Sequence, residues 1–297
     1  MDIESKKFLG QPKNFVSIFN ALLFDGKQVL KPEYLKDENS ELVMNVSSKH
    51  VDIIKRYEDG TYLDLFVIES QSYVDPSMVA RVMEYESVAR MRYIRQNFKK
   101  HIPMHTRLPM ILTVVLYVGE SKWNAAKRLS ELEIIHPGFE DMFNEFKLNL
   151  IELNTNHKYN TGEKATQDFF DLLRMIYRKQ VLKEDLDREF NRDALYFAYV
   201  VTKNKELLSI YNKSEKGDVK VCRALDEMFE ESTNRGIQMG IKQGIERGIE
   251  QGIERGEKNT QIKIAIKMLV RNDQTLEEIS EIVGLDLDAL RELKKSI

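Results

Sequence analysis

The sequence predicts an α/β fold in which a helix, three strands, a second helix and a fourth strand follow one another within about the first 130 residues. Three observations predict it. Apolar residues recur at helical spacing in residues 14–24, two short apolar runs follow on either side of an Asp-Gly pair, and a β-branched run without alternation covers residues 108–118. These patterns are typical of a helix, a hairpin and a strand buried on both faces.

The first elements are a helix over residues 14–24, ended by Asp25-Gly26, and strands near residues 42–46, 50–57 and 62–69. We expect Asp59-Gly60 to occupy a two-residue turn that joins the last two strands. The numbers of facing residues then sum to 119, so that Asp52 faces Val67.

Asp75 and Pro76 predict the start of a long helix that runs to about residue 98, with Asp75 as N-cap and Pro76 at the first helical position. The strand 108–118 follows. Residues 131–232 read as a mixed, mainly helical elaboration of the core, with a strand near 146–153 and helices near 165–178 and 188–202.

The composition indicates the kind of DNA-binding surface and the cellular compartment to expect. The 45 Lys and Arg residues nearly balance 48 Asp and Glu, so a DNA-binding surface has to be local. The single cysteine cannot form an internal disulfide, and the chain starts with acidic residues and no apolar stretch long enough to cross a bilayer. We therefore expect a cytoplasmic protein without a membrane partner.

The predicted hairpin brings together residues that suit phosphodiester hydrolysis. Asp52, Glu69 and Gln71 project from one face, because partners and residues two apart share a face, whereas Asp64 falls on the other. Carboxylates on one face can hold a divalent metal. The alternative is that Asp52 and Glu69 only end their strands in solvent.

These residues carry a resemblance. The stretch Val51 to Lys55, the strand ending in Glu69-Ser70-Gln71-Ser72, the basic helix after it, and the apolar run 108–118 with Trp123 beyond it resemble the recombination-promoting nuclease/putative transposase family. The similarity extends over most of the chain. The Asp…Glu-x-Gln pattern is that family's form of the PD-(D/E)XK site.

The resemblance implies a restriction-endonuclease-like core over residues 1–130 and Mg²⁺- or Mn²⁺-dependent endonucleolytic cleavage of DNA, linked to recombination or mobile elements. It makes Asp52 and Glu69 metal ligands and places Gln71 where most PD-(D/E)XK enzymes have lysine, whose positive charge Gln does not carry. Relatives commonly place an acid on the first helix, where this chain has Ser17. A hydroxyl is a weaker ligand, so we expect lower metal affinity or lost catalysis from this change.

Basic residues on the second helix and its exit are candidates for DNA contact. No acid interrupts the run from residue 90 to residue 107, which contains Arg90, Arg92, Arg95, Lys99, Lys100 and Arg107. Neutralisation of phosphates explains such a run, and a solvated helix face explains it equally well. His101 and His105 are separated by Pro103, which argues against a helical metal pair, and Trp123 is expected to pack on the last core strand.

A glycine ladder follows the core: from residue 236 glycine recurs at every fourth position, and most of these glycines precede isoleucine. We expect a helix over residues 233–268 that associates with another helix, most simply in a homo-oligomer, since small residues at this spacing allow close approach of two backbones. The association residues are Gly240, Gly244, Gly248 and Gly252. The alternative is a flexible linker, which has no need of regularly spaced isoleucine.

The tail, residues 269–297, is expected to be a small acidic helical segment with two helices broken at Gly284-Leu285. Its seven acids against three bases after residue 272 disfavour DNA reading. Two rivals to a nuclease stay open. One is a catalytically degenerate relative that binds DNA or protein, and the other is an assembly protein that works through the glycine ladder.

Overall fold

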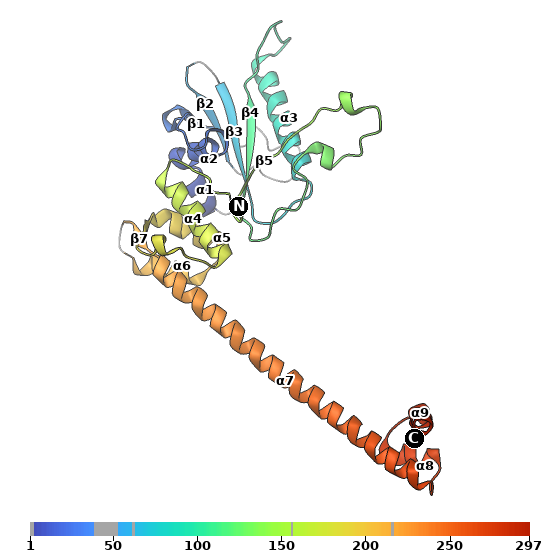
Figure 1. Cartoon of the computed structure of the whole chain (residues 1–297). Helices are drawn as coiled ribbons and strands as arrows, with labels where there is room; N and C mark the ends of the chain where they lie inside the picture. The colour runs from blue at the N-terminus through green and yellow to red at the C-terminus, as the bar shows by residue number, and fades with distance from the viewer. Residues whose placement is uncertain (1–2, 39–52, 61–62, 156, 215–216) are drawn as a thin grey trace. The chain divides into compact units, whose positions relative to one another are not determined.

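The computed structural model describes residues 3–38, 53–60, 63–155, 157–214 and 217–297 (Figure 1). The chain forms two compact units, Met1–Phe229 and Glu230–Ile297. Among its described residues, the segment predicted to elaborate the core, residues 131–232, supplies three strands and three complete helices to the first unit. Among the described residues, no helix combines the length and apolar character that crossing a membrane requires.

The first unit is built on a mixed sheet, as the α/β prediction requires. In spatial order its strands are β1 (Leu35–Asp37), β2 (Ile53–Glu58), β3 (Leu63–Gln71), β4 (Ile111–Tyr117) and β5 (Asn149–Glu152). Strands β1 to β3 pair antiparallel, whereas β3, β4 and β5 pair parallel. A further two-stranded sheet joins β6 (Glu189–Phe190) to β7 (Val219–Lys220).

Helices cover both faces of the five-stranded sheet or pack on the helices that do. They are α1 (Ile3–Leu9), α2 (Pro12–Phe24), α3 (Met78–Asn97), α4 (Lys164–Arg178), α5 (Arg192–Thr202), which packs on α1 and α4, and α6 (Lys205–Lys213), which packs on α5. Helix α3 connects the parallel strands β3 and β4 and lies on one side of the sheet, while α1 and α2 lie on the other (Figure 1). A helical crossover between parallel strands is the expected connection.

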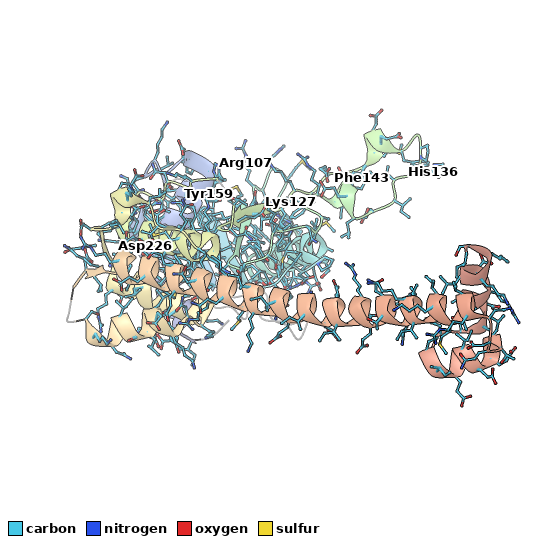
Figure 2. All side chains as sticks on the ribbon, turned by 60° about the horizontal axis from the view of Figure 1, so that its bottom comes forward. Arg107, Lys127, His136, Phe143, Tyr159 and Asp226 are labelled. Atoms are coloured by element: carbon cyan, nitrogen blue, oxygen red, sulfur yellow. The ribbon has the colours of Figure 1, made fainter. Side chains whose placement is uncertain are left out.

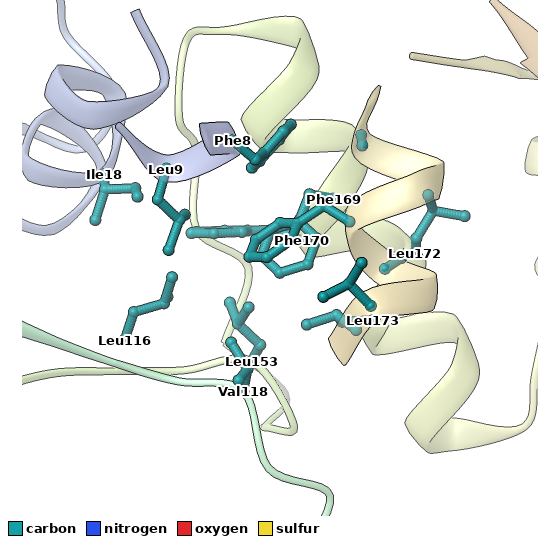
Figure 3. Close-up of a cluster of buried hydrophobic side chains, with 14 of the residues drawn as sticks. Phe8, Leu9, Ile18, Leu116, Val118, Leu153, Phe169, Phe170, Leu172 and Leu173 are labelled. Atoms are coloured by element: carbon teal, nitrogen blue, oxygen red, sulfur yellow. The ribbon is translucent and has the colours of Figure 1, made fainter. Parts of the chain in front are cut away.

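The larger core fills the face that α2 and α4 cover. Phe66 and Ile68 of β3 pack there with Phe19, whose ring centroid lies 4.8 Å from that of Phe66. Figure 3 shows the part of this cluster in which Phe8 and Leu9 of α1 meet Phe169 and Phe170 of α4. The elaborating segment is therefore part of the core rather than an appendage.

The opposite face packs against α3. Leu65 and Val67 lie in one cluster with Tyr85 and Ala89 of the helix. Trp123 packs on the last residue of β4, Tyr117, with ring centroids 5.2 Å apart, which confirms the position predicted for the tryptophan.

An ion cluster fixes α4 to the segment that precedes α5. The guanidinium of Arg188 lies 2.6 Å from Asp168 and 2.8 Å from Asp171, two carboxylates of α4 that are almost fully buried. Lys164 and Arg174 also pair with these acids. Buried charges require such partners, because an unpaired ion in the interior is costly.

Between β4 and β5 the chain makes a long excursion. Its apolar side chains Ile134, Phe139 and Met142 are exposed. Figure 2 shows His136 out on this segment, away from most of the side chains of the first unit. Residues 134–142 therefore add little to the core, whereas Trp123, Leu129 and Leu148 at the two ends of the excursion are buried in it.

The predicted hairpin register is wrong by two. Val67 pairs with Ile54, not with Asp52, and Glu58 pairs with Leu63, so facing residues have numbers that sum to 121. The reason is that Glu58 pairs with Leu63, whereas a two-residue turn at Asp59-Gly60 would pair it with Thr61; Gly60 lies at φ 89°. Because 119 and 121 are both odd, the faces assigned to the β3 side chains do not change.

The predicted N-cap of α3 is also wrong, because Ser77 occupies that position. Asp75 lies two residues earlier, where its Oδ1 accepts hydrogen bonds from the amide (2.9 Å) and the hydroxyl (2.6 Å) of Ser77. The strand predicted at residues 42–46 lies outside the described residues.

The second unit contains most of α7 (Cys222–Arg271), followed by α8 (Leu276–Val283) and α9 (Leu287–Lys295). The helix predicted at residues 233–268 falls within α7. The break predicted at Gly284 is confirmed: this residue caps α8 at φ 73°, and Asp286 caps α9. A small apolar cluster around Leu269, Ile279 and Leu290 holds the three helices together.

Candidate functional site

Glu69 and Gln71 lie side by side at the carboxyl end of β3. They continue the row of Leu65 and Val67 that faces α3, so the prediction that both project from one face is confirmed. Both are buried, with Glu69 only 2% and Gln71 only 5% exposed. A carboxylate in this position needs hydrogen-bonding or charged partners.

One oxygen of the Glu69 carboxylate accepts two of these bonds. The Gln71 amide donates to Glu69 Oε1 at 2.9 Å, and Nη2 of Arg81 donates to the same oxygen at 3.0 Å. The site therefore contains a positive charge, which α3 supplies through Arg81.

Arg81, in the first turn of α3, links three residues. Its Nη1 lies 2.5 Å from Asp75 Oδ2, and its Nε and Nη2 lie 3.1 and 2.8 Å from the hydroxyl of Tyr85. Burial works against the charge of Arg81, but the bonds to Tyr85 and Asp75 prevail and raise its pKa. Burial likewise disfavours the ionised form of Asp75, yet bonds from Ser77 and Arg81 hold its pKa below the ordinary value. The pair is thus charged at neutral pH.

Arg81 and Asp75 were not among the predicted site residues. A signal existed, because Arg81 interrupts the apolar stripe formed by Met78, Val82 and Tyr85 on the face of α3 that the sheet covers. A cation within a buried stripe requires an acid as partner. Asp75 was instead interpreted as a helix cap.

The predicted ligand Asp52 lies outside the described residues, as does His50. Within the part of the chain that the structure describes, no three Asp, Glu, His or Cys side chains come together in a way that could hold a metal. Glu69 and Gln71 nevertheless offer carboxylate and amide oxygens, the donors that hard divalent cations prefer. The donor chemistry fits magnesium or manganese, and the resemblance assigns the second carboxylate ligand to Asp52.

Ser17 lies away from Glu69. It is on α2, in the layer that packs on Phe66 and Ile68, whereas Glu69 faces α3. Its hydroxyl bonds to the Asn14 carbonyl oxygen at 2.7 Å and to Thr166 Oγ1 at 2.8 Å. The structure therefore does not bring Ser17 to the Glu69 carboxylate, because its hydroxyl points to α4. The expected effect of Ser17 on metal binding stays a prediction.

Comparison with known proteins identifies the family. The model of the YhgA-like putative transposases matches residues 6–207, about two thirds of the chain. This chain belongs to the YhgA-like putative transposase family. No curated protein and no solved structure matches it.

The matched region of this YhgA-like protein contains the five-stranded sheet and the residues around Glu69. It ends before α7, so the glycine ladder lies outside it. The family relationship therefore applies to the first unit.

The predicted DNA-contacting residues lie at the far end of α3. Arg90 is close to Glu86, at 3.7 Å, while Arg95, Lys99 and Lys100 are exposed and Arg92 is half-buried. Arg95 follows Arg81 by fourteen residues, about 21 Å along a helix. The structure thus does not bring the basic run to the Glu69 carboxylate.

His101 and His105 lie in the segment after α3, and both are exposed, as predicted for surface histidines. They are not part of the site around Glu69.

The glycine ladder forms an open stripe on α7. A side chain built at any of the six glycines from Gly236 to Gly256 would meet nothing within 4 Å. The isoleucines beside the stripe are 55–58% exposed. The chain itself therefore gives no reason for glycine at these positions.

Proposed function

We propose that this YhgA-like protein is a metal-dependent DNA endonuclease that acts in recombination or in the movement of mobile elements. The observation that carries the proposal is the buried pair of Glu69 and Gln71 at the carboxyl end of β3. In sheets with parallel strands this end is the usual place of active sites. The family and the order of helices and strands support a restriction-endonuclease-like core.

In this proposal Asp52 and Glu69 hold a magnesium or manganese ion. Asp52 directly precedes β2, whose first residue Ile53 pairs with Ile68, the neighbour of Glu69 in the sequence. A divalent ion would supply an activated water and neutralise charge on the scissile phosphate. Gln71 orients water through its amide, and the positive charge of Arg81 lies beside Glu69.

The basic run would then bind the DNA backbone away from the cleavage point. About 21 Å of α3 corresponds to roughly six steps along a DNA strand, at about 3.4 Å for each phosphate. A duplex bound along α3 could thus reach both Arg95 and Glu69.

The test is nicking of supercoiled plasmid in Mg²⁺ and Mn²⁺. We expect the wild type to cleave and both Asp52→Ala and Glu69→Ala to lose cleavage while remaining folded. Asp64→Asn is the matched control, because Asp64 lies on the same strand but faces the other side, and it should cleave like the wild type. Equal cleavage by the wild type and both alanine variants would refute the site.

A second candidate function is assembly through the glycine ladder, and the open glycine stripe beside exposed isoleucines favours it. In this second proposal, copies of the chain form a homo-oligomer through α7. A chain ending near residue 231 separates the two functions: the nuclease proposal predicts that it still cleaves DNA, whereas the assembly proposal predicts that activity and oligomer are lost together.

A further inference from the structure

We propose that Arg81 is a resident counter-ion of Glu69 with which the divalent metal competes, and that Asp75 keeps Arg81 paired once the metal is bound. The inference rests on the proposed function. It adds Arg81 and Asp75 to the site and makes them set the affinity for the metal.

The competition follows from the geometry at Glu69. The side chain of Glu69 is 3% exposed and that of Arg81 is 12% exposed, so neither charge is screened well by water. The guanidinium donates to Glu69 Oε1 at 3.0 Å. A metal ion bound by the same carboxylate would therefore lie within a few ångströms of a positive charge.

Repulsion between the Arg81 guanidinium and the metal ion should lower the affinity for the metal. The energy of two charges varies as the inverse of distance and dielectric constant, and it is several times larger at a buried site than in water. Loss of the Arg81 charge should thus tighten metal binding. A residue that only shaped Glu69 for the metal would have the opposite effect.

Asp75 gives Arg81 a second anchor. The pair is 2.5 Å apart, and Asp75 is itself held by Ser77. Tyr85 accepts two further bonds from the guanidinium. Arg81 can therefore give up its bond to Glu69 without becoming an unpaired buried charge, which would be costly.

The first experiment measures Mn²⁺ binding to the full chain by titration calorimetry. Arg81→Gln should bind Mn²⁺ at least about tenfold more tightly than the wild type, since about 1.4 kcal/mol of relieved repulsion corresponds to that factor. Arg81→Lys retains the charge and should stay near the wild type. Arg223→Gln, which removes an exposed arginine, is the control for net charge and should leave the affinity unchanged.

A second measurement uses the wild type, in case Arg81→Gln does not fold. In the NMR spectrum, the Nε–H resonance of Arg81 is assigned by its absence from the spectrum of Arg81→Lys. This resonance should shift as Mg²⁺ is added, and the midpoint of the shift should coincide with the midpoint of metal binding. Equal or weaker Mn²⁺ binding by Arg81→Gln, or a resonance that Mg²⁺ leaves in place, would overturn the inference. If Glu69-dependent cleavage persists in that case, the proposed function survives; absence of both metal binding and cleavage would end both proposals.

Discussion

The glycine stripe of α7 allows a sharp test, because its two interpretations predict different results. We consider replacement of Gly240, Gly244 and Gly248. In the isolated chain an added side chain meets nothing at these positions, and glycine in an exposed helix costs about 1 kcal/mol relative to alanine. Three Gly→Ala changes should therefore stabilise a solitary α7 by about 3 kcal/mol.

If α7 associates with a second helix, large side chains at these positions should disrupt the association. If a second α7 packs against the stripe, leucine at the three positions separates the two backbones and the oligomer dissociates. We expect sedimentation velocity to show an oligomer for the wild type at micromolar concentration and a monomer for the triple Leu variant. Circular dichroism at 222 nm should show that the variant remains helical.

The matched control places three leucines on the opposite side of α7, two residues further along at Lys242, Glu246 and Glu250, because two residues correspond to about 200° around a helix. This control should remain oligomeric. A monomeric wild type, or a Leu variant that sediments like the wild type, would refute the reasoning and leave the six glycines without a physical explanation.

Three further predictions concern the first unit. Arg188→Met leaves two buried acids with Lys164 and Arg174 as their charged partners and should lower the free energy of unfolding, followed by the fluorescence of Trp123 in urea, by about 1–3 kcal/mol. Arg223→Met removes an exposed pair and should cost less than about 1 kcal/mol; equal losses would contradict this. Burial raises the pKa of Glu86, so the wild type loses stability as the pH rises above the ordinary pKa of 4.5. Glu86→Gln should therefore have a higher melting temperature than the wild type, and the difference should be larger at pH 7 than at pH 4. A difference that does not change with pH would argue against this. Changing three arginines of α3 together to glutamine, Arg90, Arg92 and Arg95, should weaken DNA binding and make it depend less steeply on salt. An unchanged salt slope would assign these residues to a solvated face.

The face of β3 that carries Glu69 could be predicted from the sequence, although the register could not. Alternation along a strand depends only on parity, and the true pairing differs from the predicted one by two. The register depends on the length of the turn, and the Asp-Gly signal does not exclude a four-residue connection that contains the same pair.

The partners of Glu69 were harder to predict. Arg81 and Asp75 are brought to it by the packing of α3 on the sheet, which no local pattern specifies. Ser17 shows the converse difficulty, because resemblance placed it near the metal while α2 turns it toward Thr166 on the opposite face. Long-range contacts, rather than element types, account for both differences.

Binding of a divalent metal beside Glu69 is tested most directly by localised cleavage of the protein chain. Fe²⁺ bound in place of Mg²⁺ generates hydroxyl radicals with ascorbate and peroxide, and the cut positions are read by mass spectrometry. If the metal binds beside Glu69, we expect cuts close to Glu69, at the start of α3 and near Asp52, all suppressed by excess Mg²⁺ and absent from Glu69→Gln. Cuts confined to the acidic tail, or a pattern that Glu69→Gln leaves unchanged, would contradict it.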